Sequence, residues 1–178
     1  METDGLFEGD IYINKSEVTA RTVLPGSGWP GGIMIYKISQ ELLPYQNLIK
    51  RAMHAISSKT CVKFRAAGFN DRSYVNYQSR GYGCYSYLGK LPFQQQPLNL
   101  GRECLDHGTI IHETMHALGF YHEQSRKDRD QYIKILWHNI SPKGISEFQI
   151  GNPIDHLGTP YDYCSIMHYY DTAFSKVQ

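Results

Sequence analysis

Residues 112–122 have the sequence HETMHALGFYH, whose spacing predicts a helix that carries a metal site. His112 and His116 lie four positions apart, so an α-helix projects both imidazoles from one face. Two nitrogens on one face can reach a single ion at about 2.0–2.1 Å each. Glu113 points about 100° around the helix from His112, beside the ion rather than among its ligands. A base in that place can take a proton from water that the ion has activated.

The third histidine of the stretch, His122, needs a different argument. It follows His116 by six residues, and a continuing helix would carry it off the shared face. Gly119 supplies the backbone freedom for the chain to turn first. Three neutral imidazoles leave one open coordination position, as a catalytic zinc site requires. A lone histidine is usually a packing or surface residue, but three at these spacings favour a site for one catalytic Zn2+.

The chain has four cysteines, Cys61, Cys84, Cys104 and Cys164. Their spacing contains no close pair of the kind that is typical of zinc clusters, so disulfides are the better interpretation. Four cysteines allow three pairings, and the sequence alone does not choose among them. The triplets that begin at Asn14 and Asn139 fit the glycosylation acceptor pattern, which lends weak support to secretion.

Composition and charge exclude several classes of protein. Hydrophobic residues make up 41% of the 178 residues and charged residues 20%, which indicates one globular domain rather than a disordered chain. The net charge of +1 gives no case for a nucleic-acid partner or an anionic membrane surface. No apolar run is long enough to span a bilayer, so we expect no membrane insertion.

Around the histidines, the pattern predicts strands early in the chain and one central helix. Residues 1–28 show no sustained period and form an extended lead. Apolar runs and alternation predict strands over 33–38, 61–64, 74–77 and 84–88, with a weaker strand over 97–100. Helical spacing of apolar residues predicts helices over 43–57, with Pro44 in the first turn, and over 108–119. After Gly119 we expect loops and short helical pieces.

The sequence resembles the astacin family of metzincin peptidases. The resemblance rests on HETMHALGFYHEQSRKDRD over residues 112–130 and on SIMHY over 165–169, which matches the Met-turn of the family. Residues 83–89 resemble the strand at the upper rim of the cleft, and Gly31-Gly32-Ile33 after Trp29 resembles the start of the mature domain. FEGDI over residues 7–11 resembles the propeptide switch, so the resemblance covers nearly the whole chain.

This resemblance implies an α+β fold of the zincin (metzincin-like) type. We expect a twisted mixed sheet plus helices in an upper subdomain, an irregular lower subdomain and an active-site cleft between them. Residues 1–21 would be a propeptide segment with an aspartate switch, and residues 22–178 the metallopeptidase domain, with its C-terminal part apparently missing. The resemblance also suggests a Cys84–Cys104 disulfide. It places the partner of Cys61 near the carboxyl end of the domain, so a Cys61–Cys164 bond would depart from the family pattern.

The resemblance further assigns roles to individual residues. His112, His116 and His122 would be the zinc ligands and Glu113 the general base. Tyr169 would be a mobile fifth ligand that swings away to hydrogen-bond the oxyanion. In the latent form, Asp10 would occupy the coordination position that the catalytic water needs.

Three further residues take roles from the same resemblance. Met167 would lie in the turn beneath the metal. Glu123 would receive the new amino terminus after maturation, through water. Phe7 could fill an apolar subsite and hold the lead in place.

We therefore expect a secreted, zinc-dependent endopeptidase that hydrolyses internal peptide bonds of protein or peptide substrates and is made as a latent zymogen. An activating protease would cut near Ala20–Thr22, where Arg21 offers a basic site. The exposed edge of Tyr85-Ser86-Tyr87 would bind substrate backbone as an added strand. The alternative is a truncated, non-catalytic relative that acts as a binding module. The SIMHY and FEGDI motifs argue against another metzincin branch.

Overall fold

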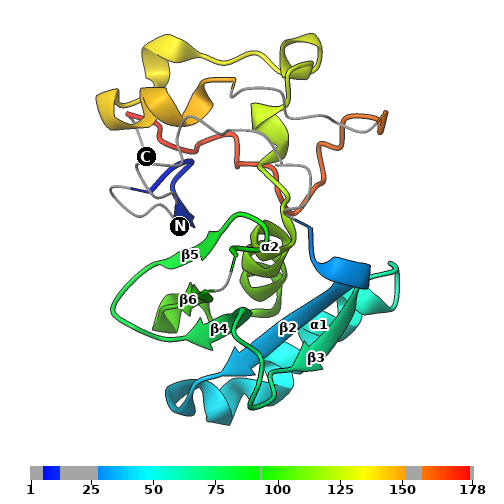
Figure 1. Cartoon of the computed structure of the whole chain (residues 1–178). Helices are drawn as coiled ribbons and strands as arrows, with labels where there is room; N and C mark the ends of the chain where they lie inside the picture. Colours follow the sequence, from blue (N-terminus) through cyan, green and yellow to red (C-terminus); the bar gives the residue numbers. More distant parts are fainter. Residues whose placement is uncertain (1–5, 13–27, 93, 151–157, 177–178) are drawn as a thin grey trace.

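The computed structural model of the chain describes residues 6–12, 28–92, 94–150 and 158–176. Within them we distinguish a sheet half (residues 28–121) and an irregular half (residues 122–176). The lead segment (residues 6–12) contacts both halves (Figure 1). The expected domain boundary after residue 21, the cleavage site near Ala20–Thr22 and the triplet that begins at Asn14 lie outside the described residues.

The sheet half is built on a six-stranded mixed sheet with the strand order β1-β5-β6-β4-β2-β3. The strands are β1 Ile11–Tyr12, β2 Ile33–Ile38, β3 Lys63–Ala66, β4 Tyr74–Gln78, β5 Cys84–Tyr87 and β6 Gln95–Leu100. Strands β3, β2, β4 and β6 run parallel, whereas β5 is antiparallel to β6. The lead segment contributes β1, which pairs in parallel with β5.

The predicted strands form with shifted ends, and the largest shift has a local cause. The strand expected at 61–64 lies at β3 instead. Thr60 Oγ1 donates to the carbonyl of Ile56 at 2.9 Å and accepts from the amide of Val62 at 3.2 Å. Because this turn takes up the first residues of the run, the strand begins two residues later. The weak strand at 97–100 is longer than expected, since β6 begins at Gln95.

Two α-helices pack together on the sheet, α1 Gln46–Ser57 and α2 His107–Leu118. The helix expected at 43–57 starts late, because Gln40–Tyr45 forms a separate 3-10 helix that contains Pro44. Proline lacks the amide that an α-helical ladder needs, so the tighter turn precedes α1. The helix expected at 108–119 is confirmed to within one residue at each end.

The apolar core lies between the sheet and these helices. Its buried members all fall between Trp29 and Ala117, and they include Met34, Ile49, Val75, Leu98 and Ile110. Two buried hydrogen bonds tie α2 to this core. Trp29 Nε1 donates to the carbonyl of Ala117 at 2.9 Å, and the hydroxyls of Tyr77 and Thr114 lie 2.8 Å apart. The helix that carries the first two histidines is therefore fixed from both sides.

The irregular half consists of short turns rather than long elements. The described residues after His122 form 3-10 helices at Glu123–Ser125, Arg129–Gln131, Trp137–Asn139 and Pro142–Phe148. The buried side chain of Arg126 ties the turns after His122 to the segment that begins at residue 158. It donates to the carbonyls of Thr159 and Pro160, both at 3.0 Å. This agrees with the expected loops and short helical pieces.

One expectation about the sheet edge is wrong for this form of the chain. The edge of β5 is not free, because β1 lies along it with Ile11 opposite Ser86 and Tyr12 opposite Tyr87. The amide of Ser86 donates to the carbonyl of Asp10 at 3.0 Å. Ile11 is fully buried, whereas Phe7 is only half-buried, so Ile11 is the apolar anchor of the lead segment.

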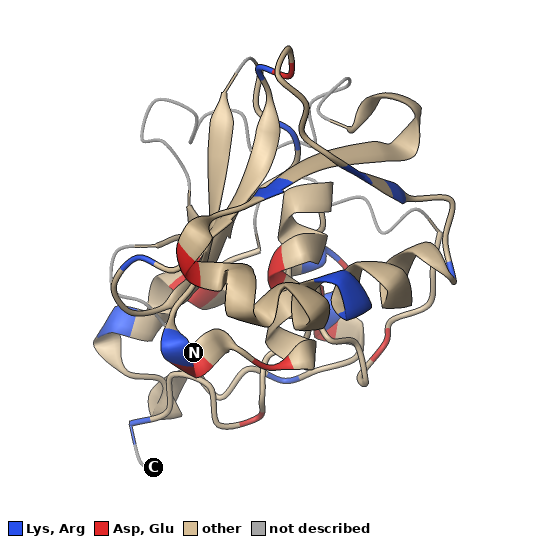
Figure 2. Cartoon of the chain, turned by 90° about the horizontal axis from the view of Figure 1, so that it is seen from below, with Lys and Arg blue, Asp and Glu red and all other residues tan. Residues whose placement is uncertain are grey.

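No helix among the described residues combines the length and the apolar character needed to cross a membrane. Figure 2 shows basic and acidic residues distributed over the ribbon, in line with the net charge of +1.

Candidate metal centre

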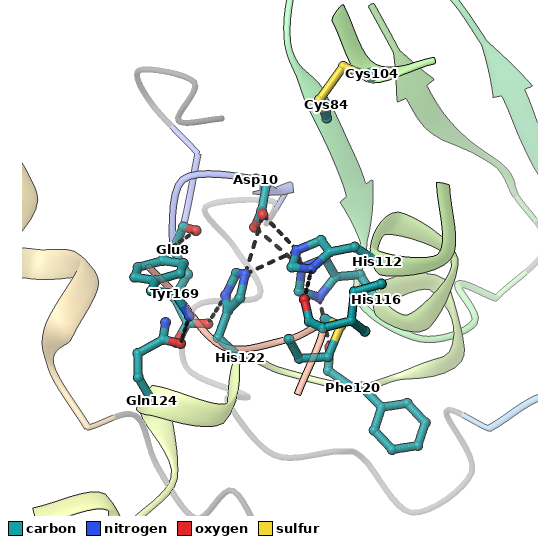
Figure 3. A network of polar contacts seen from close by, with 12 residues as sticks. Glu8, Asp10, Cys84, Cys104, His112, His116, Phe120, His122, Gln124 and Tyr169 are labelled. Atoms are coloured by element: carbon teal, nitrogen blue, oxygen red, sulfur yellow. Dashed lines mark hydrogen bonds and ion pairs between the residues drawn. A yellow bond between two sulfur atoms is a disulfide. The ribbon is translucent and has the colours of Figure 1, made fainter. Parts of the chain in front are cut away.

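Helix α2 presents His112 and His116 from one face because they lie four positions apart, and both of its ends are fixed. At the start, Asp106 Oδ1 accepts from the amide of Thr109 at 2.9 Å, which is an N-cap contact. At the end, Gly119 takes a left-handed conformation with φ 107°, and its amide donates to the carbonyl of His116 at 2.8 Å. The two Nε2 atoms lie 3.1 Å apart (Figure 3).

The turn at Gly119 brings His122 back to the same point, as the sequence predicted. Its Nε2 atom lies 3.2 Å from His112 Nε2, and its side chain is buried. Four ligands at about 2.0–2.1 Å from one tetrahedral ion would lie about 3.3 Å apart. The observed separations of 3.1 and 3.2 Å between nitrogens therefore match the geometry of a zinc site.

Asp10 of the lead segment completes the group. Its Oδ2 atom lies 3.0 Å from His112 Nε2 and 3.3 Å from His122 Nε2, and its Oδ1 atom lies 3.3 Å from His116 Nε2. The ligand atoms of these four residues all lie within 4.8 Å of one another. The structure thus brings together the three predicted histidines and the predicted aspartate.

The outer nitrogen of each histidine makes a contact that fixes its tautomer. His112 Nδ1 donates to the carbonyl of Ile166 at 2.7 Å, and His116 Nδ1 donates to that of Phe120 at 2.7 Å. His122 Nδ1 donates to the Glu8 carboxylate at 2.8 Å.

In a neutral ring this leaves Nε2 with a lone pair. Three nitrogen lone pairs and a carboxylate then converge on one point. Such a set of acceptors fits a cation, and nitrogen with carboxylate oxygen fits zinc.

The charges within this cluster act strongly on one another. Burial lowers the pKa of His116 to about 4, which favours the neutral ring that a ligand needs. Burial also lowers the pKa of His122, but the carboxylates of Asp10 and Glu8 outweigh this effect and raise it to about 9. For Asp10, burial raises the pKa, yet the neighbouring His122 and His116 hold it well below its usual range. A bound dication competes with the protons on these groups.

Glu113 lies beside the cluster rather than in it. Its side chain is buried, and it lines a cavity together with Asp10, His112, His122 and Tyr169. Its Oε2 atom has no hydrogen-bond partner within the described part of the chain. Burial, and then the charge of Asp10, raise the pKa of the Glu113 carboxyl well above its usual range. A raised pKa and a free oxygen suit a group that exchanges protons.

The turn around Met167 holds the site from the irregular half. Met167 is buried, and its carbonyl accepts from the amide of Glu123 at 2.8 Å. The preceding residue, Ile166, is the backbone partner of His112 described above. This turn therefore braces the ring of His112 and the backbone that follows His122.

Tyr169 lies next to the cluster with its hydroxyl turned toward the lead segment. Its ring centroid is 4.6 Å from that of His122. The hydroxyl donates to the carbonyl of Glu8 (Figure 3). The amide of Tyr169 donates to the side chain of buried Gln124 at 3.0 Å. In this conformation the phenol hydroxyl is bound to the backbone of the lead segment.

Sequence reasoning missed two residues of the site, Glu8 and Gln124. Glu8 contacts a histidine 114 positions away, and no local pattern reports such a contact. The one available signal was its place two residues before Asp10 in the same short motif. Gln124 follows His122 closely, but its role depends on the distant backbone of Tyr169.

The outcomes for the other predicted residues are mixed. The Cys84–Cys104 disulfide is confirmed, whereas Cys61 and Cys164 are free and exposed, so they are not bonded to each other. Glu123 already accepts from Arg126 at 2.8 Å and from the amide of Asp162 at 2.9 Å.

Together, a mixed sheet, a helix that carries two histidines and a glycine turn before the third define a zinc-peptidase fold of the metzincin class. The family model of the astacins (a peptidase family) matches residues 22–178. Zinc metalloproteinase nas-13 of Caenorhabditis elegans is 44% identical over 151 residues, which cover 83% of this chain and 33% of that protein. Low choriolytic enzyme of Oryzias latipes is 38% identical over an alignment of 183 positions, which covers 96% of this chain and 65% of that enzyme.

The fold is also that of a solved relative. High choriolytic enzyme 1, a hatching enzyme zinc-protease from Oryzias latipes, matches with a TM-score of 0.76 and 41% identity, over 84% of this chain and 74% of that one. The chain therefore belongs to the astacin family of zinc metallopeptidases, and the expected α+β fold is confirmed. It spans 26–47% of the length of four C. elegans zinc metalloproteinases that it matches.

Proposed function

We propose that this chain is the latent form of a secreted zinc endopeptidase. The observation that carries the proposal is the convergence of three Nε2 lone pairs and the Asp10 carboxylate on one point, with buried Glu113 beside it. A site of acceptors alone calls for a cation, and a free carboxyl next to that cation supplies a base. The substrate would be an internal peptide bond of a protein or peptide.

The residues of the site divide the work of hydrolysis. Zinc, when bound, supplies a Lewis acid that polarises a carbonyl and makes water more acidic. Glu113 would take a proton from the attacking water and later deliver it to the leaving amine. The hydroxyl of Tyr169 would donate a hydrogen bond to the oxyanion once it leaves the carbonyl of Glu8. The edge of β5 would align substrate backbone as an added strand.

Latency would follow from the lead segment. Asp10 lies where a fourth ligand belongs, and β1 covers the edge of β5 that a substrate strand would use. Activation would then require an activating protease to cut near Arg21, and the family match that begins at residue 22 supports a boundary there. Secretion is supported by the Cys84–Cys104 disulfide and by exposed Asn139 in its acceptor triplet.

The decisive experiment uses the full chain loaded with zinc. Asp10→Ala removes the carboxylate that holds the lead segment at the metal, so β1 can leave the edge of β5 without cleavage. This variant should therefore hydrolyse a fluorogenic peptide library, whereas the parent should not. Adding Glu113→Gln to Asp10→Ala should lower turnover by a factor of about 10²–10⁴ or more, because proton transfer is lost. Zinc content, measured by atomic emission, should remain one ion per chain in both variants.

The controls separate the two parts of the proposal. A parent and variants that all hold zinc, yet show no hydrolysis even after cleavage near Arg21, would favour the non-catalytic binding module. Equal activity of parent and Asp10→Ala would show that Asp10 does not block the site. Equal activity with and without Glu113→Gln would show that Glu113 is not the general base.

A further inference from the structure

The lead segment presents its acidic residues from a tight loop. The amide of Phe7 donates to the carbonyl of Ile11 at 2.9 Å, and the amide of Ile11 donates back to Phe7 at 2.9 Å. Between them, Glu8 and Gly9 both have positive φ angles, 49° and 77°. Glycine adopts this left-handed region readily, whereas an L residue such as glutamate is strained there. A specific contact must therefore hold Glu8 in place.

That contact is made by a buried carboxylate. The side chain of Glu8 is 1% exposed, and its Oε2 atom accepts from His122 Nδ1 at 2.8 Å. A carboxylate is costly to bury unless it is paired with a donor, so this hydrogen bond is what allows Glu8 to lie there. The backbone carbonyl of the same residue accepts from the hydroxyl of Tyr169. One strained residue thus contacts a metal ligand and the neighbouring tyrosine.

The three histidines differ in where their outer partners come from. His112 and His116 donate to backbone carbonyls of Ile166 and Phe120, both within residues 107–176. His122 donates instead to a side chain 114 positions away, on the lead segment. Departure of the lead segment therefore removes the Asp10 ligand and also the outer partner of His122.

We propose that Glu8 is a positioning residue that holds the ring of His122 toward the metal and slows zinc loss while the lead segment is in place. The proposal rests on the proposed function of the site as a zinc centre. Partners of this kind fix the orientation of a ligating histidine, and their loss typically weakens metal binding by a factor of about 10–100. The latent chain would retain zinc more firmly than the chain from which the lead has departed.

The test measures transfer of zinc from the full chain to an excess of a chelating dye. Glu8→Gly removes the carboxylate, suits the left-handed backbone and keeps the carbonyl that binds Tyr169. It should release zinc about 10–100-fold faster than the parent. Glu8→Gln, which keeps an oxygen acceptor without charge, should release zinc several-fold faster. The control Asp171→Ala removes an exposed carboxylate and should match the parent.

A second comparison separates Glu8 from Asp10. If Glu8 acts on His122, Glu8→Gly should still accelerate release when Asp10→Ala is already present. Loss of the effect in that background would mean that Glu8 merely places Asp10, and the inference fails. It also fails if a folded Glu8→Gly chain releases zinc at the rate of the parent, or, where that variant does not fold, if Glu8→Gln does so. A parent that binds no zinc would overturn the proposed function as well.

Discussion

The two halves of this molecule are stabilised in different ways. In the sheet half, the backbone ladders of five strands, β2 to β6, and a shared apolar core hold the structure, and the buried core runs from Trp29 to Ala117. In the irregular half, short 3-10 turns are held by side chains such as Arg126, which reaches two carbonyls more than 30 positions away. One half has a core of its own, and the other depends on particular contacts.

The metal site joins these halves, and this explains how it is built. His112 and His116 come from the fixed helix α2, whereas His122 begins the irregular half and Asp10 comes from the lead segment. A bound ion would therefore hold the irregular half and the lead segment against a sheet half that needs no ion.

Zinc removal should give the largest effect, and it should fall on one half. At free zinc a thousandfold above its Kd, binding stabilises the folded chain by about 4 kcal/mol. After chelation, hydrogen exchange should rise in residues 122–130, 158–176 and 6–12, while β4 and α1 keep their protection. Exchange mass spectrometry measures this directly. An equal rise of hydrogen exchange in both halves, or no rise in either, would contradict the difference between the two halves.

Arg126→Ala should give the next largest effect, again in the irregular half. The guanidinium donates to Glu123 and Asp128 at 2.8 Å and to two carbonyls, and its side chain is 5% exposed. Breaking such a buried pair costs about 3 kcal/mol or more, since the acceptors lose their donor. The variant should unfold at a lower temperature than the parent, and hydrogen exchange should be faster in residues 158–162.

The matched control is Arg65→Ala in the sheet half. Arg65 also pairs with an aspartate, Asp71, but its side chain is 50% exposed. Water screens such a pair, so the variant should unfold much as the parent does. If Arg65→Ala proves as damaging as Arg126→Ala, burial is not what distinguishes the two contacts.

The smallest effect should come from the pH dependence of the same surface pair. The hydrogen bonds from Arg65 lower the pKa of Asp71 from 3.8 to about 2. Because the folded pKa is the lower one, the pair stabilises the fold above pH 4, and this contribution disappears as pH falls toward 2. The denaturant midpoints of the parent and Asp71→Asn should differ slightly at pH 6 and converge as the pH falls to about 2. A difference that grows in acid would contradict this account.

Much of the sheet half could be predicted from its sequence. Strand β2 lies at the predicted residues, and α2 is bounded by Asp106 and Gly119, whose types are those of helix caps. Local patterns sufficed because these elements bury a periodic apolar face. The predicted start of α1 was wrong because Pro44 lies within a separate 3-10 helix, and the spacing of apolar residues does not distinguish that helix from α1.

The rest of the site could not be predicted, because it depends on contacts between distant residues. Strand β1 is two residues long and has no period to detect. Nothing in the sequence around Glu8 distinguishes it from other acidic residues, because its role depends on the contact with His122. Whether Cys61 and Cys164 form a disulfide likewise depends on where the fold places them, and their spacing in the sequence does not predict this.

The two halves should meet at a single zinc ion, and anomalous diffraction from crystals of the zinc-loaded chain can locate that ion. Data on both sides of the zinc absorption edge should show one peak, bound by Nε2 of His112, His116 and His122 at about 2.0–2.1 Å and by an oxygen of Asp10 at about 2.0–2.2 Å. A peak elsewhere, a peak that omits His122, or no peak at the histidines would contradict the account.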